Sequence, residues 1–221
     1  MTERIAGLAG VAAVAVFWIA LFAFAASYPG YSHSTKAISE LGVFGAPHAL
    51  AWNVIGYIVP GVLLAICGAG LATAIDRAGR SSALYWLLVV SGLGLAGTGV
   101  FPAEMRDGSP FLPSPFTIVH VLMEFLVGVA WAVAAFLLIG AVERNPRWRH
   151  LRPVTVTLAV LCVAGLAFNI FGRALPALSQ RPGLVQRIAF AIYFIWFVVM
   201  ALQLLSVKHR HTITSSSPAP R

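Results

Sequence analysis

Residues 116–141 read FTIVHVLMEFLVGVAWAVAAFLLIGA, and Glu124 is the only charged residue among them. The stretch exceeds the roughly 20 apolar residues with which a helix crosses the hydrocarbon core of a bilayer. His120 and Glu124 are four positions apart, so a helix places both side chains on one face. Because ionisable side chains are costly inside a membrane, this stretch predicts a functional site as well as a spanning helix.

Five further apolar stretches accompany it, and the predicted spans cover residues 6–27, 48–74, 82–101, 116–141, 153–173 and 185–207. Hydrophobic residues make up 59% of the 221 residues and charged residues 10%, whereas soluble domains have about 45–50% and about 25%. The sequence therefore predicts an all-α membrane bundle of six transmembrane helices over residues 1–211. The Ser- and Pro-rich tail, 212–221, is predicted to be disordered and cytoplasmic.

The first three spans carry further signals. The first span is longer than the about 7–15 apolar residues of a signal peptide, so we expect it to be retained. Pro60 lies inside the second span, where it removes a backbone hydrogen bond and predicts a kink. Four glycines between Gly92 and Gly99 predict close packing of the third helix against a neighbour.

The basic residues are distributed unevenly between the two ends of the predicted bundle. Six spans place both termini on one side, and that side carries ten of the fifteen Lys and Arg residues. The positive-inside rule then predicts that both termini are cytoplasmic. The net charge of +8 arises from such short loops, so no nucleic-acid partner is predicted. The inner cations are interpreted as topology signals and as contacts with lipid headgroups.

The predicted outer side holds four of the seven acids against five cations, a near balance that is typical of an internally paired polar site. The candidate catalytic residues there are His120, Glu124, Glu40 and Glu104. The candidate ligand-binding residues are Ser39, Asn169, Arg173 and Arg187.

The sequence also predicts the local structure or the partners of three of these sites. Ser39 to Gly42 is predicted to form a short re-entrant or interfacial helix that Gly42 ends. Arg173 is a candidate counter-ion for Glu124 or Glu104. Arg187 lies in the first turn of the last helix, where a cation opposes the helix dipole, so we expect it to need an acidic partner or an anionic ligand.

Four segments of the sequence resemble a known family. They are Ile38-Ser-Glu-Leu-Gly42, Gly99-Val-Phe-Pro-Ala-Glu104, His120 at the start of the fourth span, and Gly183-Leu-Val-Gln-Arg187. Over nearly its whole length the chain resembles the domain of unknown function 998 family. The resemblance implies a small prokaryotic six-helix protein of the plasma membrane, but it implies no reaction. The family often has Asp at the position of Glu104, and His33 and His48 lie outside its pattern.

Three interpretations of the outer polar residues remain open, and whether the chain is an enzyme is left undecided. One is a hydrolase or transferase acting on a lipid or lipid-linked group, with His120 and Glu124 as an acid–base pair. A metal version would recruit His33, His48 and His120, although no metal-binding motif is present. A serine version would pair Ser39 or Ser34 with His120.

The second interpretation is a non-catalytic lipid-binding protein, a transporter component or an assembly partner, and the third is a structural network that locks the bundle. Membrane lipids are the only partners predicted; the cofactor and any protein partner are left unknown. The interpretations differ in whether Glu40, Glu104, His120, Glu124 and Arg173 converge, and whether they do so around a cavity.

Overall fold

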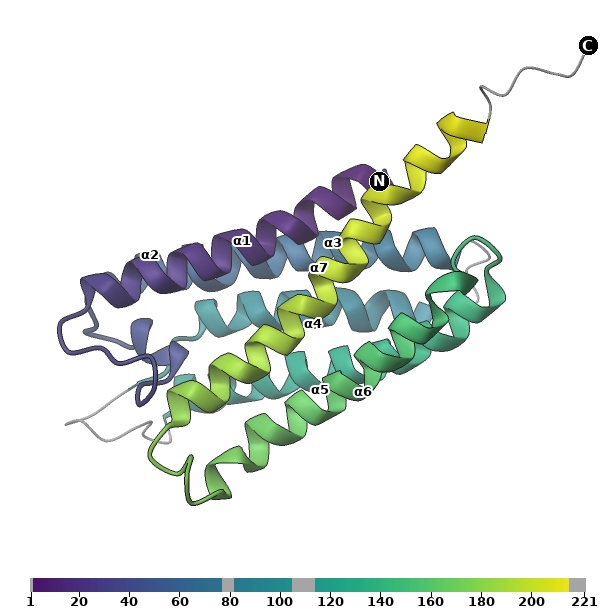
Figure 1. Ribbon diagram of the computed structural model, residues 1–221. Coiled ribbons are helices and arrows are strands. Elements are labelled where there is room, and N and C mark those ends of the chain that lie inside the picture. Colours follow the sequence, from purple (N-terminus) through teal and green to yellow (C-terminus); the bar gives the residue numbers. More distant parts are fainter. Residues whose placement is uncertain (1, 77–81, 105–113, 215–221) are drawn as a thin grey trace, which may run out of the picture.

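The computed structural model describes residues 2–76, 82–104 and 114–214. These residues form helices and no strand, and six of the helical segments are long and apolar enough to cross a membrane (Figure 1). The predicted all-α class and the six spans are thereby confirmed. The helices that each form one span are α1 (Glu3–Ser27), α4 (Ser82–Val100), α5 (Pro115–Arg144), α6 (Arg152–Phe171) and α7 (Pro182–Thr214).

The second span is built from three consecutive helical segments. They are α2 (Ala49–Trp52), the π-helical η2 (Asn53–Ile58) and α3 (Val59–Ile75). Pro60 lies at the start of α3, directly after the π-helical turns. A proline ring presses on the carbonyl four residues earlier, which here belongs to Gly56, and the wider π turn relieves that contact. The irregularity predicted at Pro60 therefore takes the form of a π-helical segment.

The helices pack as a ring. Helix α3 contacts α1 and α4, α4 contacts α5, and α5 contacts α6; α7 closes the ring against α6 and α1. Helices α3 and α4 can approach closely because Gly61 and Gly92 have no side chain where they meet. A Cβ atom added at Gly61 would lie 2.7 Å from the carbonyl oxygen of Gly92, and one added at Gly92 would lie 2.7 Å from the carbonyl oxygen of Gly61. The glycine-rich third span therefore packs closely, as its sequence predicts.

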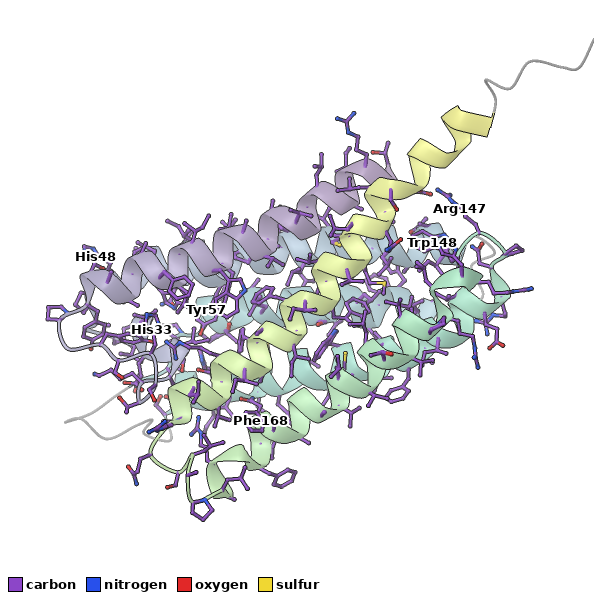
Figure 2. The ribbon with its side chains drawn as sticks, viewed as in Figure 1. His33, His48, Tyr57, Arg147, Trp148 and Phe168 are labelled. Carbon is purple, nitrogen blue, oxygen red and sulfur yellow. The ribbon has the colours of Figure 1, made fainter. Side chains whose placement is uncertain are left out.

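The start of α1 and the end of α7 lie at one end of the bundle, which we call the terminal end (Figure 1). The loop between α5 and α6 lies there too, and Figure 2 shows Arg147 and Trp148 at that end. Arg147 makes a bidentate ion pair with Glu3, with N–O distances of 2.9 and 2.6 Å. Arg147 therefore has an internal partner in addition to the topological role predicted for the cations of this loop.

The opposite end, which we call the distal end, holds residues 28–48 and the starts of α5 and α7. Helix α7 continues to Thr214, beyond the predicted start of the tail at residue 212. The rest of the predicted tail, 215–221, lies outside the described residues.

Candidate functional site

His120 and Glu124 form the core of a polar cluster at the distal end. The Nδ1 atom of His120 lies 3.0 Å from the carbonyl oxygen of Thr98 and 2.9 Å from that of Phe101, both at the end of α4. Carbonyl oxygens only accept hydrogen bonds, so these contacts assign a proton to Nδ1. The Nε2 atom lies 3.7 Å from Oε1 of Glu124 and has no hydrogen-bond partner among the described residues. The side chain is nearly enclosed, with 3% of its surface exposed.

Gln186 joins this pair to the loop that follows α1. Its amide oxygen accepts a hydrogen bond from the backbone N–H of Ile38 at 2.6 Å, and its amide nitrogen donates to Oε1 of Glu124 at 3.2 Å. Gln186 is buried, with 4% of its surface exposed. The sequence analysis did not single it out, because an uncharged amide at a helix start gives no signal of its own. It does lie within Gly183–Arg187, one of the segments that carry the family resemblance.

The short helix predicted around Ser39 is present as the 3-10 helix η1 (Ile38–Leu41), and Gly42 ends it. Both Ser39 and Glu40 are buried. Oε1 of Glu40 accepts the backbone N–H of Ala37 at 2.7 Å, and its Oε2 lies 3.9 Å from Nζ of Lys36. The Glu40 carboxylate therefore stabilises the turn that contains it and does not join the His120–Glu124 pair.

Arg187 donates hydrogen bonds to neutral acceptors and pairs with no acid among the described residues. Its Nε donates to Nδ1 of His33 at 3.1 Å, and its Nη2 donates to the hydroxyl of Tyr31 at 2.7 Å. Its Nη1 donates to the carbonyl oxygens of Lys36 and Gly183 at 3.0 and 2.9 Å. The loop folds back over α7 and supplies these acceptors, so the described residues contain no acidic partner, and the alternative of an anionic ligand stays a prediction.

This loop also contacts the first turn of α7, where the N–H of Leu184 donates to the carbonyl oxygens of Ser34 and Arg181 at 3.0 and 3.1 Å. The docked loop shifts two titratable groups. Burial raises the pKa of Tyr31, although the nearby Arg187 acts in the opposite direction. Burial and the positive charge of Arg187 lower the pKa of His33.

Two predicted residues at the distal end stand apart from the cluster. The backbone N–H of Glu104 donates to the hydroxyl of Thr117 at 2.9 Å, but the Glu104 carboxylate has no partner among the described residues. Arg173 is exposed on the 3-10 helix η4 (Gly172–Ala174). It forms no ion pair with Glu124 or Glu104, so the suggested pairing is absent from the described part of the chain. Five residues were predicted to converge: Glu40, Glu104, His120, Glu124 and Arg173. The structure brings only His120 and Glu124 together.

The histidines of the alternative metal set lie in different surroundings. His33 packs against the rings of Phe22 and Tyr31, and His48 packs against Phe24 (Figure 2). Within residues 2–76, 82–104 and 114–214, no three His, Cys, Asp or Glu residues are placed to share a metal ion. The structure does not bring His33, His48 and His120 together.

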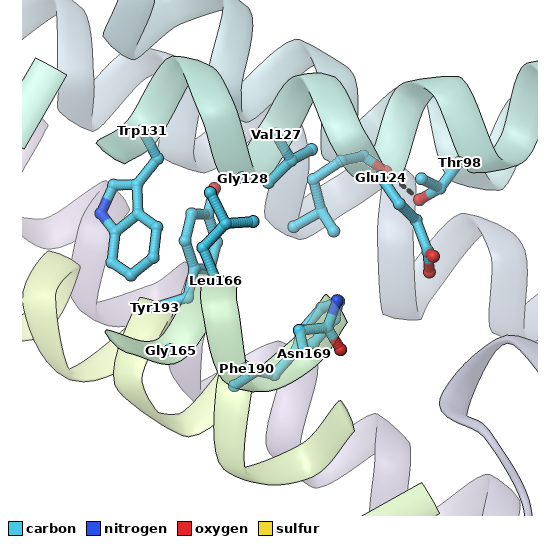
Figure 3. A pocket seen from close by; sticks show the side chains of 12 residues that line it. Thr98, Glu124, Val127, Gly128, Trp131, Gly165, Leu166, Asn169, Phe190 and Tyr193 are labelled. Atoms are coloured by element: carbon cyan, nitrogen blue, oxygen red, sulfur yellow. Dashed lines mark hydrogen bonds between the residues drawn. The ribbon is translucent and has the colours of Figure 1, made fainter. Parts of the chain in front are cut away.

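Glu124 also lines a pocket between α4, α5, α6 and α7 that contains about 60 Å³ of free space (Figure 3). Glu124 and Asn169 face this space from α5 and α6, and Trp131 and Tyr193 lie at its other end. Most of the lining is apolar. The full lining comprises Leu95, Thr98, Glu124, Val127, Gly128, Trp131, Gly165, Leu166, Asn169, Ala189, Phe190 and Tyr193.

The fold and this site define a six-helix, multi-pass membrane protein with a polar cluster at one end of the bundle. A family model described as "Protein of unknown function (DUF998)" matches residues 11–203, and the chain belongs to this family. The resemblance seen in the sequence is thereby confirmed, and the matched range includes His120, Glu124 and Gln186. No curated protein and no solved structure matches the chain detectably.

Proposed function

We propose that this protein binds a lipid or another amphiphilic small molecule in the pocket beside Glu124. One observation carries the proposal: the pocket is largely apolar, but the carboxylate of Glu124 and the amide of Asn169 lie at one end of it. Ligand sites are mostly apolar clefts in which a few polar groups fix the orientation of the ligand. The pocket is lined by transmembrane helices, so an apolar chain can enter it from the surrounding lipid.

The unused hydrogen-bonding capacity of the cluster supports a ligand over a purely structural network. Oε1 of Glu124 receives the contacts of both His120 and Gln186, and Oε2 has no partner among the described residues. Nε2 of His120 is buried and has no hydrogen bond within the described chain. Buried polar groups in native proteins are normally hydrogen-bonded, so the free Nε2 beside a partly exposed carboxylate is a favourable place for a polar ligand group.

We place this site on the extracytoplasmic side of a prokaryotic plasma membrane. The support is the excess of Lys and Arg at the terminal end, which the positive-inside rule assigns to the cytoplasm. A membrane-impermeant thiol reagent applied to intact cells should label Thr35→Cys at the distal end but not His150→Cys at the terminal end. Both positions are exposed, and the native Cys67 and Cys162 are buried. Labelling of His150→Cys alone would reverse the orientation.

Native mass spectrometry of the protein purified in mild detergent tests the binding function. A leucine at Gly128 fills the pocket, because even a Cβ atom there would lie 2.7 Å from Cδ1 of Leu166. Gly140→Leu is the matched control on the same helix, where a Cβ atom would meet only the side chain of Arg144, at 3.2 Å. We expect a co-purifying amphiphile in the wild type and in Gly140→Leu, and its loss in Gly128→Leu. Equal retention in both variants would place any bound amphiphile elsewhere.

The catalytic roles suggested for the polar residues remain predictions. His120 and Glu124 lie together, as an acid–base pair requires, but Glu40 and Glu104 make no contact with them. Asn169 lines the pocket and fits a ligand-binding role. The binding function therefore uses the observed geometry without requiring a reaction.

A further inference from the structure

The charge of the pocket limits the kind of amphiphile that fits it. Among the twelve described residues that line the pocket, Glu124 is the only Asp, Glu, His, Lys or Arg. Its carboxylate lies at one end, with the amide of Asn169 across the same space (Figure 3). The pocket therefore presents acceptors and a negative charge to the head of any ligand whose chain lies along Val127 and Leu166.

No Arg or Lys at the described distal end forms an ion pair with Glu124. The three nitrogens of the Arg187 side chain donate to neutral acceptors on the loop after α1 and on α7. Nζ of Lys36 lies 3.9 Å from Glu40 and 5.2 Å from the centre of the Tyr28 ring. Arg173 is exposed and makes no ion pair within the described chain. No Arg or Lys of the described residues compensates Glu124.

His120 is the described basic side chain nearest to Glu124, but its hydrogen bonds go elsewhere. Its Nδ1 atom lies against the carbonyl oxygens of Thr98 and Phe101. Its Nε2 atom lies 3.7 Å from Oε1 of Glu124 and makes no hydrogen bond to the described residues. Gln186 then contributes the single hydrogen bond that Glu124 receives from the described residues, at 3.2 Å. A partly buried carboxylate with so little compensation favours a cation beside it.

We propose that the pocket takes a cationic amphiphile whose protonated amine lies between Oε2 of Glu124 and the side-chain oxygen of Asn169. This rests on the proposed binding function and adds the class of headgroup. An alkylammonium group brings three N–H donors, enough for both oxygens. A phosphate or carboxylate head would instead meet the Glu124 charge with no described cation beside it, so anionic lipids are poor ligands for this site.

Four probes with the same alkyl chain isolate the headgroup: dodecylamine, dodecanol, dodecanoate and dodecyl phosphate. Each is titrated into the full-length protein in a nonionic detergent, and binding is read by native mass spectrometry. We expect dodecylamine to bind about tenfold more tightly than dodecanol, because hydrogen bonds to charged groups are stronger than neutral ones. The two anionic probes should bind more weakly than dodecanol.

Glu124→Gln keeps the size of the side chain and removes its charge, so it should abolish the preference for the amine. Glu143→Gln is the matched control on the same helix. Glu143 is exposed at the terminal end, and its ion pair with the exposed Arg152, at 3.6 Å, contributes little to stability. Asn169→Leu removes the second acceptor and should lower the affinity for dodecylamine. Circular dichroism and gel filtration report whether each variant is folded.

The outcomes separate the headgroup from the binding function. Equal affinity for amine and alcohol, or an amine preference that survives Glu124→Gln in a folded protein, overturns the cationic headgroup. If Gly128→Leu still abolishes binding in that case, the pocket remains a binding site and only its headgroup class was wrong. If Gly128→Leu changes the binding of none of the four probes, both the headgroup and the proposed function fail.

Discussion

Replacing Gln186 by leucine tests how much this side chain contributes to holding the loop after α1 against the bundle. Leucine has a similar size but offers no hydrogen bonds, so the buried N–H of Ile38 loses its acceptor at 2.6 Å and Glu124 loses its donor at 3.2 Å. Leaving a buried donor unsatisfied costs about 1–3 kcal/mol, and a hydrogen bond to a charged group contributes about 1.5–3 kcal/mol. We expect the free energy of unfolding to fall by about 3 kcal/mol.

The assay is unfolding in mixed detergent micelles followed by tryptophan fluorescence, with hydrogen exchange at the Ile38 amide as an independent readout. Gln203→Leu is the matched control, because Gln203 is a half-buried glutamine on the same helix whose side chain has no hydrogen bond within the described chain. We expect the control to change stability by less than about 0.5 kcal/mol. A loss near 0.6 kcal/mol for Gln186→Leu, the average for polar contacts in membrane bundles, with unchanged exchange at Ile38, would refute the bridging role.

Three further predictions concern the docked loop and the terminal end. Lowering the pH from about 7.5 to about 5 should weaken the docking of the loop, measured as faster hydrogen exchange of residues 31–41. The pKa of His33 is lowered in the folded protein, so the unfolded chain binds the proton more readily. The stability that depends on neutral His33 is therefore present above about pH 6.5 and is lost as the pH falls below it. His33→Gln should remove the pH dependence, and an unchanged profile in that variant would contradict the assignment. Tyr31→Phe should destabilise the docked loop by about 1–2 kcal/mol in the same exchange experiment, because the hydroxyl both accepts from Arg187 and donates to a backbone carbonyl. Arg147→Lys should cost about 1 kcal/mol in the unfolding assay, since an ammonium group cannot form the bidentate pair with Glu3; a double-mutant cycle with Glu3→Gln that gave no coupling would show that the pair contributes nothing.

The six spans could be predicted from the sequence because the thickness of a bilayer fixes the length of an apolar helix. The predicted span 82–101 agrees with α4 (Ser82–Val100), and 6–27 agrees with α1 (Glu3–Ser27), to within a few residues at each end. The contact between His120 and Glu124 was predictable for a similar reason. Both side chains belong to one helix, so their spacing alone places them on the same face.

The rest of the site depends on contacts between segments far apart in the chain, which local patterns do not specify. Gln186 is 148 residues from Ile38, and no local sequence pattern in either segment indicates that they form a hydrogen bond. Arg187 was expected to need an acidic partner or an anionic ligand because a sequence shows charges but not the backbone carbonyls that a folded loop presents. Arg173 was assigned to the cluster by its position at a helix end, but the structure places it in an exposed turn.

The most direct test of the account is a crystal structure of the protein with a chain-brominated dodecylamine, in which anomalous scattering locates the bromine. The account predicts a bromine peak in the pocket beside Gly128 and an amine within hydrogen-bonding distance of Glu124. A pocket that holds only water, with bromine peaks confined to the outer surface of the helices, would contradict it.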